Sequence, residues 1–249
     1  MMKKKGQVTI FVILAILIVA GIIVFFLYAN RGGESSVSVN PKSSVVKCVQ
    51  SAVGKSVEKI LANGGMANQG LSLQYRGVNF SYLCYTGDYY LTCYNLYPMI
   101  FDKIESDVVE DTKGEVQNCF NSMREDFESH GYVVDGDTTS YSTSLLPGKV
   151  KINLNKKITV TNGDNSQSFN EFGTEILTPT YELVRIAHEI VNSEAKYCNF
   201  EYNGYMLLYS QYKIQRFDYE GSKIYRVTDR LSGKEFRFAV RSCAFPPGI

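Results

Sequence analysis

The pair His188-Glu189 is the first place in this chain to look for catalytic chemistry. Both residues lie in a segment with helical periodicity. A zinc protease built on such a pair needs a second histidine one helical turn later, because two imidazoles on one helix face hold the metal. Position 192 is Asn192, so that ligand is missing. The favoured interpretation is a helix-surface histidine beside a glutamate, without a metal.

Other patterns that carry chemistry are also incomplete. Asp135 and Asp137 are spaced as Ca²⁺ ligands can be, but Asp-Gly-Asp is more often a turn. The chain contains no G-x-S-x-G nucleophile motif and no G-x-x-x-x-G-K-[ST] phosphate loop. We therefore predict no catalytic, cofactor-binding or metal-binding residues.

One short modification motif is present. Asn79-Phe80-Ser81 fits the acceptor pattern for N-glycosylation. The pattern is common in proteins of every kind, so Asn79 is a candidate acceptor only if this part of the chain is exported.

The cysteines favour an oxidising compartment. All six follow residue 47, and an even number outside the N-terminal segment indicates disulfides. Six cysteines can pair in many ways, and sequence does not fix the pairing. Local patterns suggest a bridge across a hairpin-like turn, a bridge between two helices, and a third from the remaining two. The candidate pairs are Cys84 with Cys93, Cys48 with Cys119, and Cys198 with Cys243.

Composition limits the class of partner. The chain has 249 residues, with 26 basic and 25 acidic side chains and a net charge of +1. A balance this close to zero disfavours nucleic acid as a partner. The chain has 18 Tyr and no Trp. Tyrosine is common at contact surfaces, although it also fills ordinary strand positions.

The N-terminal segment predicts a membrane anchor. Residues Gly6 to Asn30 carry no charge, and the run Val8 to Leu27 is almost entirely apolar. A helix of about 20 residues spans roughly the 30 Å hydrocarbon core of a bilayer. The basic run at residues 3–5 predicts a cytoplasmic N-terminus. A cleaved secretory signal is the less favoured alternative, because its apolar region is usually shorter.

The same segment resembles the class III signal of archaeal type IV pilin-like proteins. The similarity is carried by K-K-K-G-Q-V-T-I-F, residues 3–11. It implies cleavage after Gly6, so that the mature chain begins at Gln7. Many members carry a glutamate five residues into the mature chain, where this chain has Phe11. That difference favours an anchored monomer over a filament subunit.

The order of features further along resembles a group of uncharacterised membrane-anchored surface proteins of small-genome archaea. The similarity rests on the N-terminal K-K-G-Q-V-T-I-F, on two cysteine-bearing helices, and on F-R-F-A-V-R at residues 236–241. It implies location and architecture and no biochemistry.

The predicted organisation has four parts. Residues 1–6 are a basic cytoplasmic end, 7–29 a transmembrane helix, 30–44 a linker, and 45–249 an extracellular domain with a candidate subdivision near 135–147. Periodicity predicts helices over 45–62, 99–130 and 180–197. Alternation predicts strands near 71–76, 79–85, 89–94, 149–154, 157–161, 168–177, 205–210, 213–219, 223–229 and 235–241. The fold class is therefore α+β, with an antiparallel sheet and about three packed helices after one transmembrane helix.

These observations favour a non-enzymatic cell-surface protein. We expect it to be single-pass and membrane-anchored, with its bulk outside the cell and an interaction or structural domain held by disulfides. Its expected partners are membrane lipid and surface or filament proteins. The alternative is an exported, anchored hydrolase acting on envelope glycan, for which a close pair of carboxylates would be needed. A sensor ectodomain is disfavoured because no cytoplasmic output domain is visible.

Overall fold

The computed structural model describes residues 5–29, 41–136, 140–170 and 172–246. The chain divides into two compact units, Met1–Asn40 and Pro41–Ile249. The first contains the helix α1 (Lys5–Ala29), and the second contains every other element.

The predicted transmembrane helix is not supported, and the fold class is corrected on this point. Within the part of the chain that the structure describes, no helix is both long and apolar enough to cross a membrane. In α1, side chains are described only for residues 13–26.

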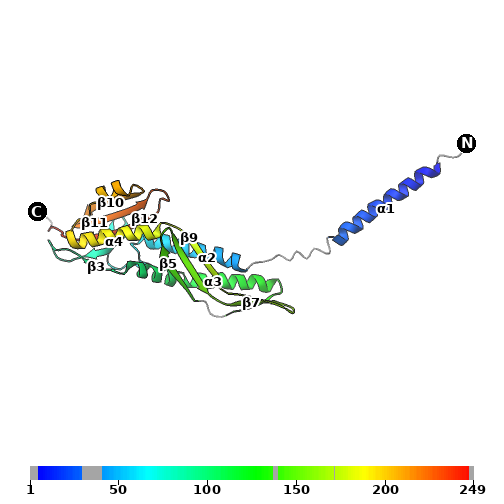
Figure 1. The fold of residues 1–249 in the computed structure, drawn as a ribbon, viewed down its shortest axis with the longest axis horizontal. Coiled ribbons are helices and arrows are strands. Elements are labelled where there is room, and N and C mark those ends of the chain that lie inside the picture. Colours follow the sequence, from blue (N-terminus) through cyan, green and yellow to red (C-terminus); the bar gives the residue numbers. More distant parts are fainter. Residues whose placement is uncertain (1–4, 30–40, 137–139, 171, 247–249) are drawn as a thin grey trace. The chain divides into compact units, whose positions relative to one another are not determined.

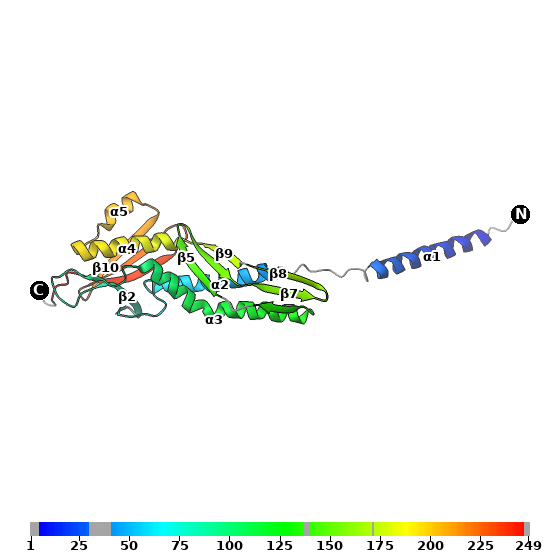
Figure 2. The same cartoon turned by 60° about the horizontal axis from the view of Figure 1, so that its bottom comes forward.

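The second unit is an α+β domain, as predicted (Figures 1 and 2). Two long helices lie side by side along one part of the domain, and two more helices pack beside its largest sheet. The helices are α2 (Pro41–Ala62), α3 (Ile100–Ser129), α4 (Thr180–Tyr197) and the short α5 (Tyr202–Leu208).

Its strands form three sheets. The largest has the order β1-β2-β12-β11-β10, with β3 paired to β2, and the others are β4-β7-β8 and β5-β6-β9. The strands are β1 (Ser72–Tyr75), β2 (Val78–Tyr85), β3 (Tyr94–Asn95), β4 (Val133–Gly136), β5 (Ser140–Leu146), β6 (Lys149–Asn155), β7 (Ile158–Asn162), β8 (Asn165–Phe169), β9 (Phe172–Leu177), β10 (Tyr212–Tyr219), β11 (Ser222–Asp229) and β12 (Glu235–Arg241).

Helices α2 and α3 pack through an apolar stripe of α2, in which Val45 takes the place that the sequence pattern gave to Val46. Val45, Val49, Val53 and Ile60 are all buried. The stripe recurs every three or four residues, which places it on one helix face. Helix α2 begins at Pro41, a residue that fits the first helical turn because it needs no backbone donor there. The stretch 135–147, considered above as a subdivision, contains β5 within the single second unit.

The large sheet departs from the prediction in one pairing. Strands β2 and β12 are parallel, with Ala239 opposite Tyr82, and every other pair is antiparallel. About 150 residues separate these two strands in the chain, so no local signal indicates their pairing. A register shift between Ala239 and Val240 lets the following residues change face.

Candidate functional site

One face of the large sheet is covered by α4. Successive residues of a strand point to opposite faces, so β11 sends Tyr225 toward α4 and Ile224 away from it. Tyr225 donates a hydrogen bond of 2.5 Å to Oε1 of Glu194 on α4. Tyr225 also stacks on Phe238 of β12, with ring centroids 5.4 Å apart. This side of the sheet is ordinary core.

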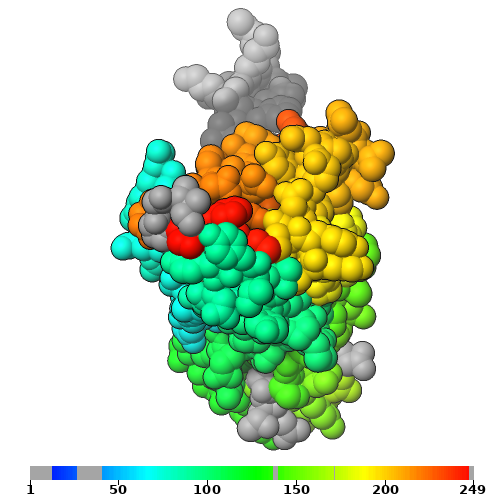
Figure 3. Space-filling model, turned by 90° about the vertical axis from the view of Figure 1, so that its left-hand side faces the viewer, coloured from blue at the N-terminus to red at the C-terminus, as the bar shows by residue number. Residues whose placement is uncertain are grey.

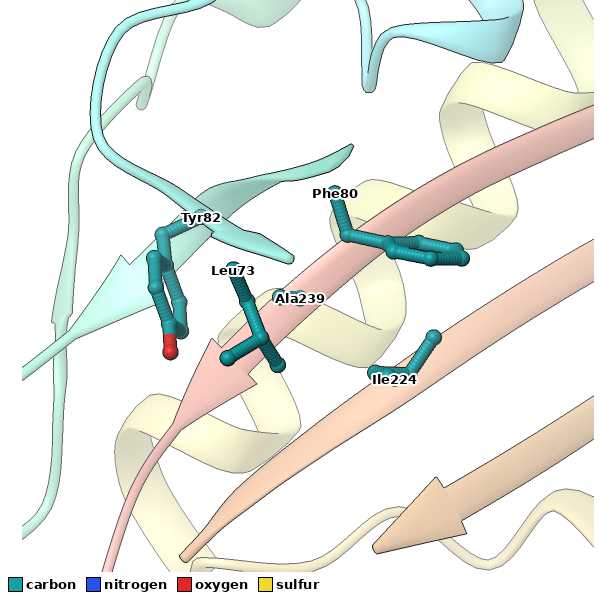
Figure 4. Packing of buried hydrophobic residues seen from close by; sticks show 5 residues of the cluster. All are labelled: Leu73, Phe80, Tyr82, Ile224 and Ala239. Atoms are coloured by element: carbon teal, nitrogen blue, oxygen red, sulfur yellow. The ribbon is translucent and has the colours of Figure 1, made fainter. Parts of the chain in front are cut away.

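The opposite face carries a second apolar cluster (Figure 4). Its buried members come from four strands: Leu73, Phe80, Tyr82, Ile224 and Ala239. Three tyrosines pack against their edges: Tyr75, Tyr85 and Tyr219. Among the described residues, the members of this cluster all come from strands.

The sheet curls toward this second face. Strands β1 and β10 are its two edges, and four strand spacings of about 4.8 Å separate them in a flat sheet. Nevertheless the rings of Tyr75 on β1 and Tyr219 on β10 have centroids 5.0 Å apart. Near them, the hydroxyls of Tyr82 and Ser222 are hydrogen-bonded at 2.8 Å. The face is therefore concave and closed at one end by tyrosines.

The open end of this concave face holds a cavity of about 280 Å³. Phe80 and Ile224 form its buried floor. Val78 and Phe217 form side walls and are 38% and 36% exposed. Its complete lining is Tyr75, Arg76, Val78, Phe80, Phe217, Ile224, Arg226 and Arg237.

Three guanidinium groups stand around the cavity. Arg226 and Arg237 share one carboxylate, since Nη2 of Arg226 is 2.8 Å from Oε2 of Glu235 and Nε of Arg237 is 3.4 Å from Oε1. Arg76 lies in the β1–β2 turn, with its guanidinium 5.2 Å from the centroid of the Tyr75 ring. Among the described residues, Arg76 has no carboxylate within ion-pair distance.

The polar side chains that line the cavity are one tyrosine and three arginines. It contains no serine, cysteine, histidine or carboxylate, and Glu235 is held by two arginines beside it. Glycoside hydrolysis needs two carboxyl groups across the reacting bond. The cavity therefore offers the glycan hydrolase alternative no support.

The residues considered for chemistry in the sequence do not form a site. His188 is 3.3 Å from Asn192 through its ring Nε2, and its ring lies edge-on to Phe101. Glu189 is instead paired with Arg185. In the described part of the chain no three metal-ligating side chains come together. Asp135 pairs in β4 opposite Thr159, while Asp137 lies outside the described residues.

The three disulfides are Cys48–Cys119, Cys84–Cys93 and Cys198–Cys243, the pairs that local sequence patterns suggested. The first joins α2 to α3. The second braces the turn between β2 and β3, and the third joins the end of α4 to the segment after β12. The first and the third join elements that are far apart in the chain, with sequence separations of 71 and 45 residues.

Exposed aromatic side chains lie at the braced turn, among them Tyr90, Tyr94 and Phe245. Figure 3 shows this end of the domain, with the segment around residue 90 in green beside the chain end in red. There the segment around residue 90 runs beside the end of the chain, because the amide of Tyr90 donates to the carbonyl of Ala244 at 3.0 Å. The rings of Tyr90 and Phe245 meet at 5.5 Å. Arg241 lies over Tyr89 and Tyr85, at 5.1 and 5.9 Å from the ring centroids.

The candidate modification residues have different surroundings. Asn79 is exposed in β2, but Ser81 is buried and its hydroxyl donates to the carbonyl of Asn63 at 2.7 Å. Gly6 and Gln7 fall within the backbone of α1, where their side chains are not described. Processing after Gly6 therefore stays a prediction.

Sequence reasoning missed the cavity residues. Alternation was recognised in three of the strands, at 213–219, 223–229 and 235–241. It places Phe217, Ile224, Arg226 and Arg237 on the same face of the sheet. The curl that brings β1 beside them depends on contacts across the sheet and leaves no signal in a single strand. The chain matches no known family model, no curated protein and no solved structure.

Proposed function

We propose that this chain is an exported, non-enzymatic interaction domain that holds an apolar group of its partner in the sheet-face cavity. Disulfides persist in oxidising compartments, and the three of this domain are consistent with export. The observation that carries the proposal is the cavity itself, about 280 Å³ with a floor of Phe80 and Ile224.

The lining explains why the bound group is apolar. Ligand sites are typically concave and mostly apolar, with a few polar groups at defined positions. Val78 and Phe217 are large apolar side chains left partly exposed at the cavity. Covering them removes apolar surface from water, which stabilises the complex by about 25 cal/mol per Å² before the costs of association.

Binding of an uncharged two-ring compound tests the proposal. We expect 2-naphthamide to bind the full chain at one saturable site, followed by fluorescence titration. Val78→Trp replaces a small aliphatic side chain of the cavity wall with a bulky indole ring. It should lower the affinity for 2-naphthamide at least tenfold. Position 78 begins a strand and is partly exposed, so an aromatic residue is compatible with folding there.

Tyr94→Ala is the matched control, because Tyr94 is an exposed aromatic residue that does not line the cavity. It should bind 2-naphthamide as the unchanged chain does, and circular dichroism should show both variants folded. Absence of binding to the unchanged chain, or equal affinity in the Val78→Trp chain, would refute the proposal.

A further inference from the structure

We infer that the group held in the cavity belongs to an amphipathic anion, an apolar body with a carboxylate or similar acidic head, and that Arg76 binds the head. This inference rests on the proposed function and adds the chemical class of the ligand.

The cavity volume limits the size of the ligand's apolar part. A cavity of about 150 Å³ lined by aliphatic and aromatic side chains takes up benzene. The present cavity, at about 280 Å³, is nearly twice as large. A body of two fused rings, or a branched aliphatic group of similar volume, therefore fits.

The charges around the rim of the cavity favour a ligand with an acidic head group. Glu235 accepts from Arg226 at Oε2 and lies against Arg237 at Oε1, so one carboxylate balances two guanidiniums. Thr228 also approaches Oε2, at 3.5 Å. Arg76, which has no ion pair among the described residues, brings the guanidiniums that line the cavity to three, while no carboxylate lines it. A ligand cation would meet like charges, whereas an anion relieves their repulsion.

The Arg76 guanidinium is placed for a direct contact. Its planar fork can donate two parallel hydrogen bonds to a carboxylate, a geometry that lysine cannot reproduce. The Arg76 guanidinium lies 5.2 Å from the centroid of the Tyr75 ring, and both residues line the cavity, so this contact restricts the guanidinium beside it. The apolar walls lower the local dielectric and so strengthen the ion pair relative to bulk water.

Three naphthalene compounds of similar shape, which differ in the charge of the head group, separate the effect of charge from the effect of shape. We expect 2-naphthoate to bind the full chain about tenfold more tightly than 2-naphthamide at low salt, and 2-naphthylmethylammonium to bind most weakly. The preference for 2-naphthoate should shrink as salt is added, because the rim is partly open to solvent. Adding 2-naphthyl phosphate to the set shows whether the head is selected as a carboxylate or as any anion.

Arg76→Gln tests the assigned residue. It should reduce the ratio of 2-naphthoate to 2-naphthamide affinity by about five- to tenfold while leaving 2-naphthamide binding unchanged. Arg76 has a φ of 49°, and glutamine meets the same backbone cost there as arginine. Arg230→Gln, at an exposed arginine that does not line the cavity, is the control and should change neither affinity.

The outcomes are distinguishable. If all four compounds bind alike, the anionic head is refuted while the proposed function stands. If the preference for 2-naphthoate survives Arg76→Gln unchanged, the role of Arg76 is refuted. If 2-naphthamide does not bind, the proposed function falls, and this inference, which rests on it, falls as well.

Discussion

Glu194 is a carboxylate without solvent contact, and its partners show how this fold accommodates a buried charge. Its side chain is 0% exposed and lies 2.6 Å from Nζ of Lys223, which is 17% exposed. Tyr225 donates to its other oxygen. Burial, and then the nearby negative charge of Glu194, raise the pKa of Tyr225, so the phenol stays a donor across the physiological range. The network fixes α4 on β11.

We predict that Glu194→Ala lowers the free energy of unfolding by about 3–5 kcal/mol, because Lys223 loses its buried counter-charge. Urea unfolding followed by circular dichroism measures the loss. Glu125→Ala, at an exposed α3 glutamate, is the control and should change stability by less than about 0.5 kcal/mol.

A double variant separates the charge from the packing. Replacing the pair together, as Glu194→Leu with Lys223→Met, should recover much of the stability lost in Glu194→Ala, since no unpaired charge remains. A loss below about 1 kcal/mol in the single variant would show that the pair does not stabilise the fold as argued.

Between helices, the contact of α2 with α3 combines an apolar stripe with an ionic pair. Asp111 of α3 accepts from Lys59 at 2.5 Å and from Ser56 at 2.7 Å, both on α2. The hydrogen bond from Lys59 holds the pKa of the Asp111 carboxyl below its usual value, against the opposing effect of burial. The disulfide Cys48–Cys119 joins the same two helices covalently.

This contact predicts a dependence of stability on pH. Since the folded state keeps Asp111 ionised to lower pH, the unfolded chain binds more protons once the pH falls below about 4. The stabilisation from Asp111 is then complete above its unfolded pKa and is lost as the pH falls through its lowered folded pKa. Asp111→Asn should remove this part of the pH profile, at most about 1 kcal/mol because the pair is partly exposed.

Urea midpoints of both chains between pH 2 and pH 6 give the comparison. The two curves should converge at the acidic end and separate above about pH 4. Parallel curves over the whole range would contradict the assignment of the lowered pKa to Asp111.

The elements differ in how far sequence reveals them. Each of the helices α2, α3 and α4 carries apolar residues spaced so that they share one helix face. This spacing made the positions of the three helices predictable. The segment near 205–210 was predicted as a strand, and this is wrong, because residues 202–208 form α5. Glu201 caps that helix by accepting from the amide of Gly204 at 3.3 Å. A short apolar run fits either structure when only its periodicity is considered.

The same limit applies to the cavity. Alternation in β10, β11 and β12 predicts which side chains share a face of the sheet, and the hairpin-like β1 and β2 were also recognised. The parallel pairing of β2 with β12 and the contact of Tyr75 with Tyr219 are long-range. They are decided by packing across the whole sheet, and they create the cavity.

For the folded domain as a whole, the three disulfides and the curled sheet have complementary roles. The disulfides constrain α2, α3, α4 and the chain end, while the concave face stays free of helices and lined by aromatic and arginine side chains. A constrained scaffold lowers the entropic cost of presenting a binding surface. This division of roles is what the interaction-domain proposal requires.

The most direct measurement is an NMR titration of the isotope-labelled full chain with 2-naphthoate, observing the methyl groups of Val78 and Ile224. We expect saturable shifts at these two residues and at the Arg76 side chain. The methyl groups of Leu207 and Leu231, which are exposed and do not line the cavity, should be unchanged. Shifts centred on the aromatic surface around Tyr90, or no saturable shift at Ile224, would contradict the proposed binding in the cavity.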